Sequence, residues 1–378
     1  MAGMHTTAPV PPAHPPADPL PLLRMVLAGG PREPRRLLLE RGLPARAGAE
    51  LQARQAAVRG ALLDRCLGWL SLPGHHFLAW NDPRYPPLLR QCQDAPLGLF
   101  VAGDPDHLWH PALAIVGSRS ASAGGRDHAR AFAGAFCRAG LAVASGLAAG
   151  IDGAAHEAAL DGAGITLAVL GTGPDRAYPR QHAGLMERVA AHGAVVSEYP
   201  PGTPPRAEHF PGRNRIIAGL SLGTLVVEAA LRSGALITAR MAAEYGREVF
   251  ALPGSIHNPQ ARGCHRLIRD GAQLVETPQE VLAGIAGLAG RLARDLAPAT
   301  PAAAPPEPGR SQPGPATDHD ILWQSLGHDP IPMDVLAERT GLTPASLSSM
   351  LLAMELDGRL VVEHGRYARR STGGDAVA

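Results

Sequence analysis

The chain has 378 residues, 45% of them hydrophobic, and a formal net charge of +1 at pH 7. This length can bury one large core with one or two small modules beside it, and the near-zero charge restricts any site for a polyanion to a local patch. All 35 basic residues are arginine, which excludes P-loop lysines, Schiff-base lysines and lysine nucleophiles, and with them the usual forms of P-loop ATPases and pyridoxal enzymes.

The N-terminal segments predict short elements ahead of the main domain. Residues 1–19 are rich in proline, so we expect a disordered tail, and they lack the basic start and apolar run of a secretory signal. Residues 20–75 predict a small helical module, similar to SAM or helix-hairpin-helix domains, with Gly and Pro breaks. Residues 76–111 hold aromatic residues and prolines and predict a lead-in segment of connections.

The middle of the chain alternates short apolar runs with helical stretches. This alternation predicts an α/β fold: a Rossmann-like, mostly parallel sheet with helices on both faces. We place this domain at about 110–286, or 76–286 with its lead-in. The expected strands are 112–116, 141–144, 165–170, 194–196, 224–227, 248–252 and 272–275.

The C-terminal part predicts a linker at 287–316, a winged helix at 317–370 and a tail at 371–378. Helical patterns cover 318–326 and 333–339, Thr343 can cap a helix that starts at Pro344, and 359–367 can form a hairpin around His364 and Gly365. Residues 318–370 hold eight acidic residues against five arginines. We therefore expect weak DNA contact or protein interaction from this domain rather than sequence-specific duplex binding.

Glycines and arginines gather where the predicted parallel strands end, which is where such sheets bind ligands. Bare backbone amides, helix N-termini and guanidinium forks suit phosphate groups. Structural turns would explain the glycines equally well, and the first strand lacks the GxGxxG of a dinucleotide cofactor site. The candidate phosphate-binding residues in these loops are Gly117, Ser118, Arg119, Ser145, Gly146, Gly150 and Arg180.

A second cluster of candidates lies at 209–221. Phe210 precedes Arg213, Asn214 and Arg215, and a stacking ring beside phosphate forks is typical of a groove for single-stranded nucleic acid. The alternative is that Phe210 belongs to the core and the arginines are solvated. Between 205 and 270 there are nine arginines against five acidic residues, a local excess of the right sign.

Residues from roughly 80 to 285 resemble the DprA/Smf family. The matching motifs are the Gly117–Ser118–Arg119 loop and the stretches 145–152, 171–179, 196–200, 210–221, 228–239 and 246–254. The resemblance implies binding of single-stranded DNA, loading of the RecA recombinase during natural transformation, and a homodimer formed through the Rossmann-like domains.

The resemblance also carries phosphate-binding positions onto this chain. They fall on Arg119, on Arg180 and on Arg213 to Arg215. Arg232 and Ser233 are further candidates, and Arg232 can either meet phosphate or pair with Glu198 or Glu228. A further basic position of the family falls on Ala207, beside Arg206. For Glu198 and Glu228 we expect structural hydrogen bonds, because carboxylates repel DNA. Asp152 is expected to cap a helix.

The main alternative is an enzyme, a nucleotide phosphoribohydrolase on a related sheet. That family carries PGGxGTxxE, whereas residues 221–228 lack the double glycine and place Glu228 one residue late, which turns a strand side chain to the opposite face. A structural interaction protein is a third possibility. We therefore expect no catalytic residue, no cofactor and no metal, since Cys264 and His265 lack partners at ligand spacing.

The expected location is the cytoplasm. The four cysteines are scattered and predict reduced thiols. No apolar run reaches the roughly 18 residues of a membrane span.

Overall fold

The computed structural model describes residues 19–29, 36, 54–58, 60–296, 322, 325–326, 331–343, 346–348, 350–351, 354, 360–363 and 366–369. The chain divides into two compact units, unit 1 at Met1–Pro298 and unit 2 at Ala299–Ala378. The predicted tails at 1–18 and 371–378 lie outside the described residues, whereas Pro19 is the first residue of helix α1 (Pro19–Leu27).

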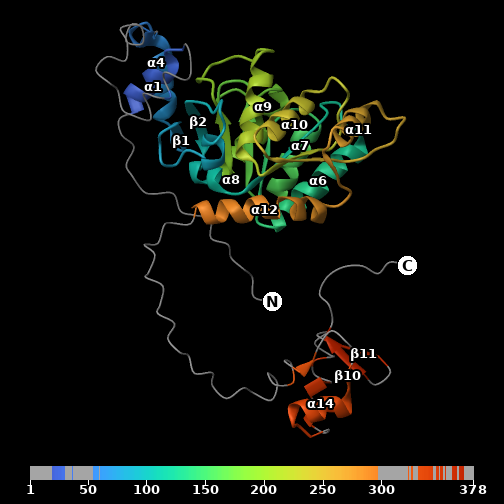
Figure 1. Ribbon diagram of the computed structural model, residues 1–378. Coiled ribbons are helices and arrows are strands. Elements are labelled where there is room, and N and C mark those ends of the chain that lie inside the picture. The colour runs from blue at the N-terminus through green and yellow to red at the C-terminus, as the bar shows by residue number, and fades with distance from the viewer. Residues whose placement is uncertain are drawn as a thin grey trace, which may run out of the picture. The chain divides into compact units, whose positions relative to one another are not determined.

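A mostly parallel sheet forms the centre of unit 1 (Figure 1). Within the described residues it has nine strands, in the order β1-β2-β6-β5-β4-β3-β7-β8-β9. Strands β3 to β9 pair in parallel, while β1 and β2 add an antiparallel edge beside β6. The strands are β1 (His75–Ala79), β2 (Gly98–Gly103), β3 (Ala112–Val116), β4 (Ala142–Ser145), β5 (Thr166–Leu170), β6 (Ala194–Ser197), β7 (Gly223–Val226), β8 (Glu248–Ala251) and β9 (Gln273–Leu274).

The seven strands predicted from the apolar runs are all present, each within two residues of its expected ends. The segment predicted as connections differs, because it contributes strands β1 and β2. Both are short, and prolines such as Pro86 and Pro96 interrupt the sequence between them. Their partners decide their structure: Phe100 and Val101 of β2 lie opposite Ser197 and Val196 of β6.

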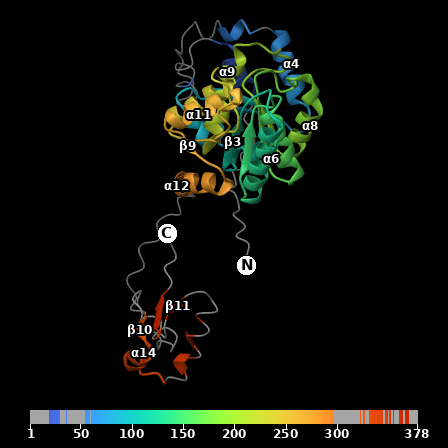
Figure 2. The same cartoon turned by 90° about the vertical axis from the view of Figure 1, so that its right-hand side faces the viewer.

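Helices cover both faces of the sheet, as Figures 1 and 2 show. Alternate residues of β3 divide between the two cores: Leu113 and Ile115 pack with helices α6 and α7, and Ala114 and Val116 with α9. This period of two is what a strand buried on both faces requires. The helices of the α/β body are α5 (Pro87–Arg90), α6 (Ala123–Arg138), α7 (Ile151–Asp161), α8 (Ala183–His192), α9 (His209–Leu220), α10 (Gly234–Glu244), α11 (Arg262–Arg269) and α12 (Pro278–Leu296); short 3₁₀ turns span Pro105–Trp109, Arg180–His182 and Pro259–Ala261.

Helices α1 and α4 (Gly60–Leu70) belong to the predicted N-terminal helical module and pack on the β1–β2 side of the sheet. Leu63, Cys66 and Trp69, at helical spacing, form the buried face of α4. The indole of Trp69 stacks on His75 with ring centres 4.1 Å apart and meets Phe100 edge-on at 5.9 Å. The shared core therefore holds α4 firmly on the α/β body.

Helix α12 corrects one domain boundary. The linker predicted from 287 starts too early, because α12 continues to Leu296 and lies along one edge of unit 1 (Figure 1). Val281 and Ile285 anchor it in the core with Phe250. The Ala and Gly content of 287–296 concealed a helix that packing stabilises. The remaining linker residues, 297–316, lie outside the described residues.

Unit 2 has the fold of a winged helix. Strands β10 (Ile331–Pro332), β11 (Leu360–Glu363) and β12 (Arg366–Arg369) form a small antiparallel sheet in the order β10-β12-β11, beside helix α14 (Met333–Thr340). Its buried core includes Leu336, Leu347, Leu351 and Met354. The hydroxyl of Thr343 accepts the N–H of Ser346 at 3.3 Å, the expected cap. Residues 344–345 and the turn at 364–365 are outside the described part.

The described part of the chain contains no helix that is long and apolar enough to cross a membrane.

Candidate nucleic-acid interface

The candidate site lies where the strand order reverses. Strand β3 has β4 on one side and β7 on the other, so the chain leaves β3 and β7 in opposite directions across the sheet. Open α/β sheets bind ligands at such a point, beyond the carboxyl ends of the strands. A hollow of about 700 Å³ is present there, which we call the switch-point hollow. Its lining includes Gly117, Ser118, Arg119, Tyr178, Arg206, Phe210, Arg213, Asn214, Arg232, Ser233 and Thr238.

One wall is built from a cation and two aromatic rings. The guanidinium carbon of Arg119 lies 5.3 Å from the centre of the Phe210 ring, a cation–π distance. The centre of the Tyr178 ring lies 5.2 Å from that of Phe210, and the two rings are tilted by 44°. Tyr178 is 42% exposed. The wall can therefore offer a charge to a phosphate and a ring face to a base.

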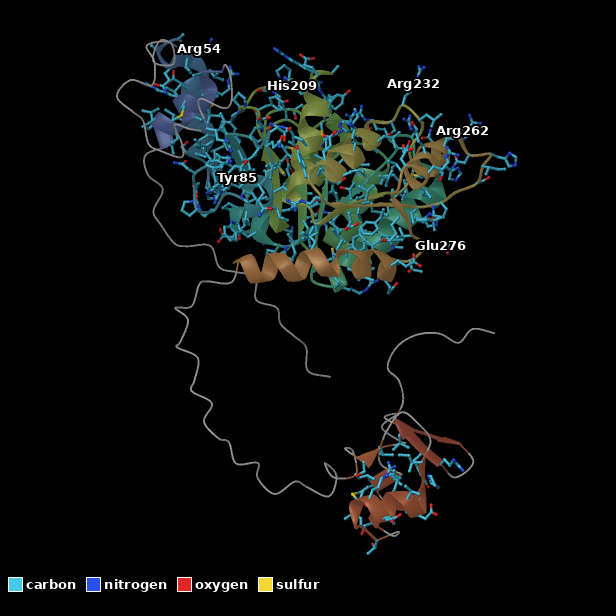
Figure 3. All side chains as sticks on the ribbon, in the orientation of Figure 1. Arg54, Tyr85, His209, Arg232, Arg262 and Glu276 are labelled. Carbon is cyan, nitrogen blue, oxygen red and sulfur yellow. The ribbon has the colours of Figure 1, made fainter. Side chains whose placement is uncertain are left out.

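The opposite wall is the loop after β7 and the start of α10. Arg232 is exposed, and Figure 3 shows its side chain extending away from the ribbon. Ser233 caps α10, its hydroxyl accepting the N–H of Ala235 at 3.3 Å. Among the described residues, Arg119, Arg206 and Arg232 make no ion pair with a carboxylate. Three cations are therefore available to an anion in this hollow.

The loop after β4 supports the hollow rather than forming a phosphate cradle. The hydroxyl of Ser145 is buried and donates to the Ile115 carbonyl at 2.6 Å, and the N–H of Gly146 donates to Asp152 Oδ2 at 3.1 Å. Gly150 has φ of +82° and is itself the N-cap of α7. Asp152 is therefore not the cap that we expected: its carboxylate orders the loop from the first turn of the helix. Both groups are therefore bonded within the protein, and the phosphate role predicted for Ser145 and Gly146 stays a prediction.

Two predicted phosphate ligands are buried structural residues. Arg213 is 4% exposed, and its Nη1 donates to the carbonyls of Gly146, at 2.6 Å, and of Val169. Burial lowers the pKa of Arg213 to about 10, although the nearby Asp152 carboxylate opposes this shift. Arg213 borders the hollow, but its guanidinium joins the loop after β4 to the end of strand β5. Its predicted contact with a phosphate stays a prediction, and its contacts with the two carbonyls are structural.

Arg215 is also 4% exposed and does not line the hollow. Its Nη2 donates to Glu198 Oε1 at 2.7 Å, and its Nε lies 3.4 Å from Asp94 Oδ2. The two carboxylates pair with the guanidinium in this structure, and the predicted contact of Arg215 with DNA stays a prediction. Asn214 lies between the two arginines and donates from Nδ2 to the Gly234 carbonyl at 3.1 Å.

The remaining predicted residues fall into two groups. Ser118 is buried and its hydroxyl accepts the N–H of Ser120 at 3.1 Å, so it shapes the turn. Arg180 is exposed in the loop after β5 but lies outside the hollow lining. Glu198 and Glu228 make structural hydrogen bonds, as predicted: the Glu228 carboxylate accepts from the Ser122 hydroxyl at 2.6 Å.

Tyr178 and Arg206 are two lining residues that can meet a ligand and that we did not assign to the site from the sequence. Both were visible there, Tyr178 in the 171–179 motif and Arg206 beside Ala207. The signal for Arg206 was its position next to a site that is basic in the family. Tyr178 gave no sign that its ring would lie against Phe210, because 31 intervening residues separate them in the chain.

Comparisons with known proteins identify the family of this chain. The sequence model of the family described as DNA recombination-mediator protein A matches residues 76–286. The chain belongs to this family. A second model, the DprA winged helix domain, matches residues 298–366.

Two relatives match this chain over most of their own length. The chain is 44% identical over 308 residues to Protein Smf of Escherichia coli, covering 81% of this chain and 80% of that protein. It is 48% identical over 203 residues to DNA processing protein DprA of Streptococcus pneumoniae, covering 53% and 71% of the two chains.

Two solved structures of the family resemble the fold. DprA of Streptococcus pneumoniae superposes with a TM-score of 0.64 at 38% identity, over 71% of this chain and 98% of that one. DprA of Helicobacter pylori, described for its single-stranded DNA binding mode, gives a TM-score of 0.51 at 27% identity, over 57% and 96%.

Proposed function

We propose that this chain binds single-stranded DNA in the switch-point hollow, protects it and helps to load the RecA recombinase onto it during natural transformation. The observation that carries the proposal is the convergence of Arg119, Arg206 and Arg232 around the rings of Phe210 and Tyr178. Cations that follow a backbone beside rings that stack on bases are the two parts of a single-strand groove. Support also comes from the Helicobacter pylori relative, whose structure concerns single-stranded DNA binding.

The test is a fluorescence-anisotropy titration of the full chain with single-stranded and duplex oligonucleotides at several salt concentrations. We expect tighter binding of the single strand. The logarithm of its affinity should fall linearly with the logarithm of the salt concentration, by about 0.7 for each neutralised phosphate. Equal affinity for both forms, or none for either, would contradict the proposal.

RecA loading is the second part of the proposal and rests on family membership. It is tested by following RecA filament formation on single-stranded DNA that carries a single-strand-binding protein. The chain should shorten the lag before filaments form, and a chain without an effect on the lag would remove this part only. We place the activity in the cytoplasm, where RecA acts on DNA.

We also propose that the chain works as a homodimer. Leu231, Ile237 and Leu274 are exposed by 48%, 36% and 46%. The first two border a second hollow of about 960 Å³, which also reaches Gln273 of β9. In the described residues β9 pairs with β8 alone, so its other edge is open, and open edges invite pairing. Light scattering should give twice the mass of one chain for the original protein. For Leu274→Arg it should give the mass of the monomer.

The last part of the proposal is that the chain catalyses no reaction. The carboxylate that a phosphoribohydrolase would need corresponds to Glu228, which does not line the hollow and is bonded to Ser122 and Asn258. Incubation with AMP should release no free base. Release of adenine would favour the enzyme hypothesis instead.

A further inference from the structure

We infer that the N-terminal helix α4 is part of the DNA-binding surface and that Arg65 extends the path of the single strand beyond the switch-point hollow. This inference rests on the proposed function. It concerns how far the strand runs and which module it meets. The observation behind it is the position of Arg65 over a loop at the carboxyl edge of the sheet.

Arg65 lies directly over the loop that follows β6. A methyl group in place of the Gly202 hydrogen would lie 2.5 Å from Nη1 of Arg65 and 2.9 Å from its Cδ. The N–H of Gly202 donates to Asp175 Oδ1 at 2.7 Å, which ties this loop to the loop after β5. Arg65 therefore stands above the same strand ends that carry the rest of the site.

The buried face of α4 fixes this position. Cys66 next to Arg65 is fully buried, and Trp69 one turn later is 7% exposed. His75 Nδ1 shares a hydrogen bond of 2.8 Å with the Trp69 carbonyl, at the end of the helix. Arg65 itself is exposed and, among the described residues, makes no ion pair. Its charge faces solvent from a rigid helix.

Exposed arginines connect Arg65 with the hollow. Arg206 follows β6, Arg176 and Arg180 follow β5, Arg119 follows β3, and Arg232 follows β7. These strands are neighbours in the order β6-β5-β4-β3-β7, and adjacent strands lie about 4.8 Å apart, so the row spans roughly 19 Å. Figure 3 shows Arg54 of the N-terminal module, His209 and Arg232 along one edge of unit 1.

The acidic residues near this path are few. Asp175 uses a carboxylate oxygen on the N–H of Gly202, and Asp64 and Glu208 are exposed. Four arginines from Arg65 to Arg206 thus face three carboxylates, and the hollow adds Arg119 and Arg232. A polyanion of extended shape, with one charge on each repeating unit, fits such a row, and a single-stranded nucleic acid has this chemistry.

The experiment compares a short and a long single strand, of about 5 and about 16 nucleotides, by fluorescence anisotropy with the full chain. Arg65→Glu should lower the affinity for the long strand by about tenfold and leave the affinity for the short strand unchanged, because only the long strand reaches α4. Arg119→Glu should lower the affinity for both strands. Arg138→Glu is the matched control: it lies at the end of α6, which begins at the carboxyl edge of the sheet and so ends at the opposite edge.

Each outcome decides the inference. If Arg65→Glu leaves the affinity for the long strand unchanged, or lowers the affinity for both strands equally, the inference is overturned. If Arg65→Glu lowers the unfolding midpoint, Arg65→Gln replaces it and should reduce the salt slope for the long strand by about 0.7. An Arg119→Glu variant that binds both strands normally would instead refute the proposed function, and this inference would fall with it.

Discussion

The guanidinium of Arg119, in the loop after β3, lies 5.3 Å from the centre of the Phe210 ring, in the first turn of α9. The ring holds an exposed cation at the hollow, and among the described residues no carboxylate forms an ion pair with it. A phosphate can therefore meet Arg119 at full charge. This relationship makes Arg119 the first residue to test.

Arg119→Ala should weaken single-strand binding by about 1.5–3 kcal/mol, the contribution of a charged hydrogen bond. It should also reduce the salt slope by about 0.7, because one phosphate is no longer neutralised. Arg130→Ala is the control, since Arg130 already pairs with Asp127 at 3.0 Å on α6. Anisotropy titrations over a salt series measure both quantities, and an unaltered slope would contradict the phosphate contact.

Tyr178→Ala should distinguish the contribution of base stacking to single-strand affinity from the contribution of charge. Its ring is 42% exposed and lies 5.2 Å from Phe210, so it can receive a base. We expect a loss of about 1–3 kcal/mol in single-strand affinity with an unchanged salt slope, because the ring carries no charge. Tyr178→Phe should bind like the original chain. A slope that changes with Tyr178→Ala would show that the ring acts through a neighbouring cation.

Gly150 and Gly140 form a matched pair for the loop geometry. Their φ angles are +82° and +79°. A Cβ on Gly150 would overlap the carbonyl oxygens of Ser118 and Arg119, whereas one on Gly140 would meet nothing within 4 Å. Gly140→Ala should cost about 1–2 kcal/mol of strain. Gly150→Ala should lower the free energy of unfolding more than Gly140→Ala does, and it should also weaken DNA binding. Urea unfolding measures the first effect and fluorescence anisotropy the second. Equal losses of stability and of affinity in the two variants would contradict a special role for Gly150.

The sequence predicts the parallel strands well because each is an apolar run between glycine-rich turns. It predicts the site in part. Arg119, Phe210 and Arg232 reach the hollow because they directly follow strands or start the next helix. The burial of Arg213 was not visible, since its carbonyl partners lie 67 and 44 residues away. The sequence shows which residues carry a charge, but the packing of the fold decides which groups pair or hydrogen-bond with them.

Arg213→Ala should destabilise the fold strongly. The side chain is buried and joins the loop after β4 to strand β5. Its removal leaves the Gly146 and Val169 carbonyls without their donor and the Asp152 carboxylate without a nearby cation. Breaking a buried charged cluster costs about 3–5 kcal/mol. Arg188→Ala breaks an exposed pair with Asp161 and should cost about 0.2–1 kcal/mol. Similar unfolding midpoints in urea for the two variants would contradict the structural role.

His156 should make stability depend on pH. Its Nδ1 lies 2.7 Å from Thr166 Oγ1, and in the described residues its Nε2 has no hydrogen-bond partner. Burial, with smaller contributions from the charges of His182 and Arg213, lowers the pKa of His156 from 6.5 to about 3. Protonation therefore favours the unfolded chain, whose histidine takes up the proton first. The free energy of unfolding should be highest above pH 6.5 and fall between pH 6.5 and about 3.

The slope that His156 adds is roughly 1 kcal/mol per pH unit in that range. His156→Gln keeps a polar group that can reach Thr166 but removes the titration, so its stability should fall less between pH 6.5 and pH 4 than that of the original chain. His128→Gln, at an exposed position of α6, should leave the slope unchanged. Urea unfolding across this pH range gives the comparison. Parallel curves for the original chain and His156→Gln would show that the buried imidazole is not the source of the acid sensitivity.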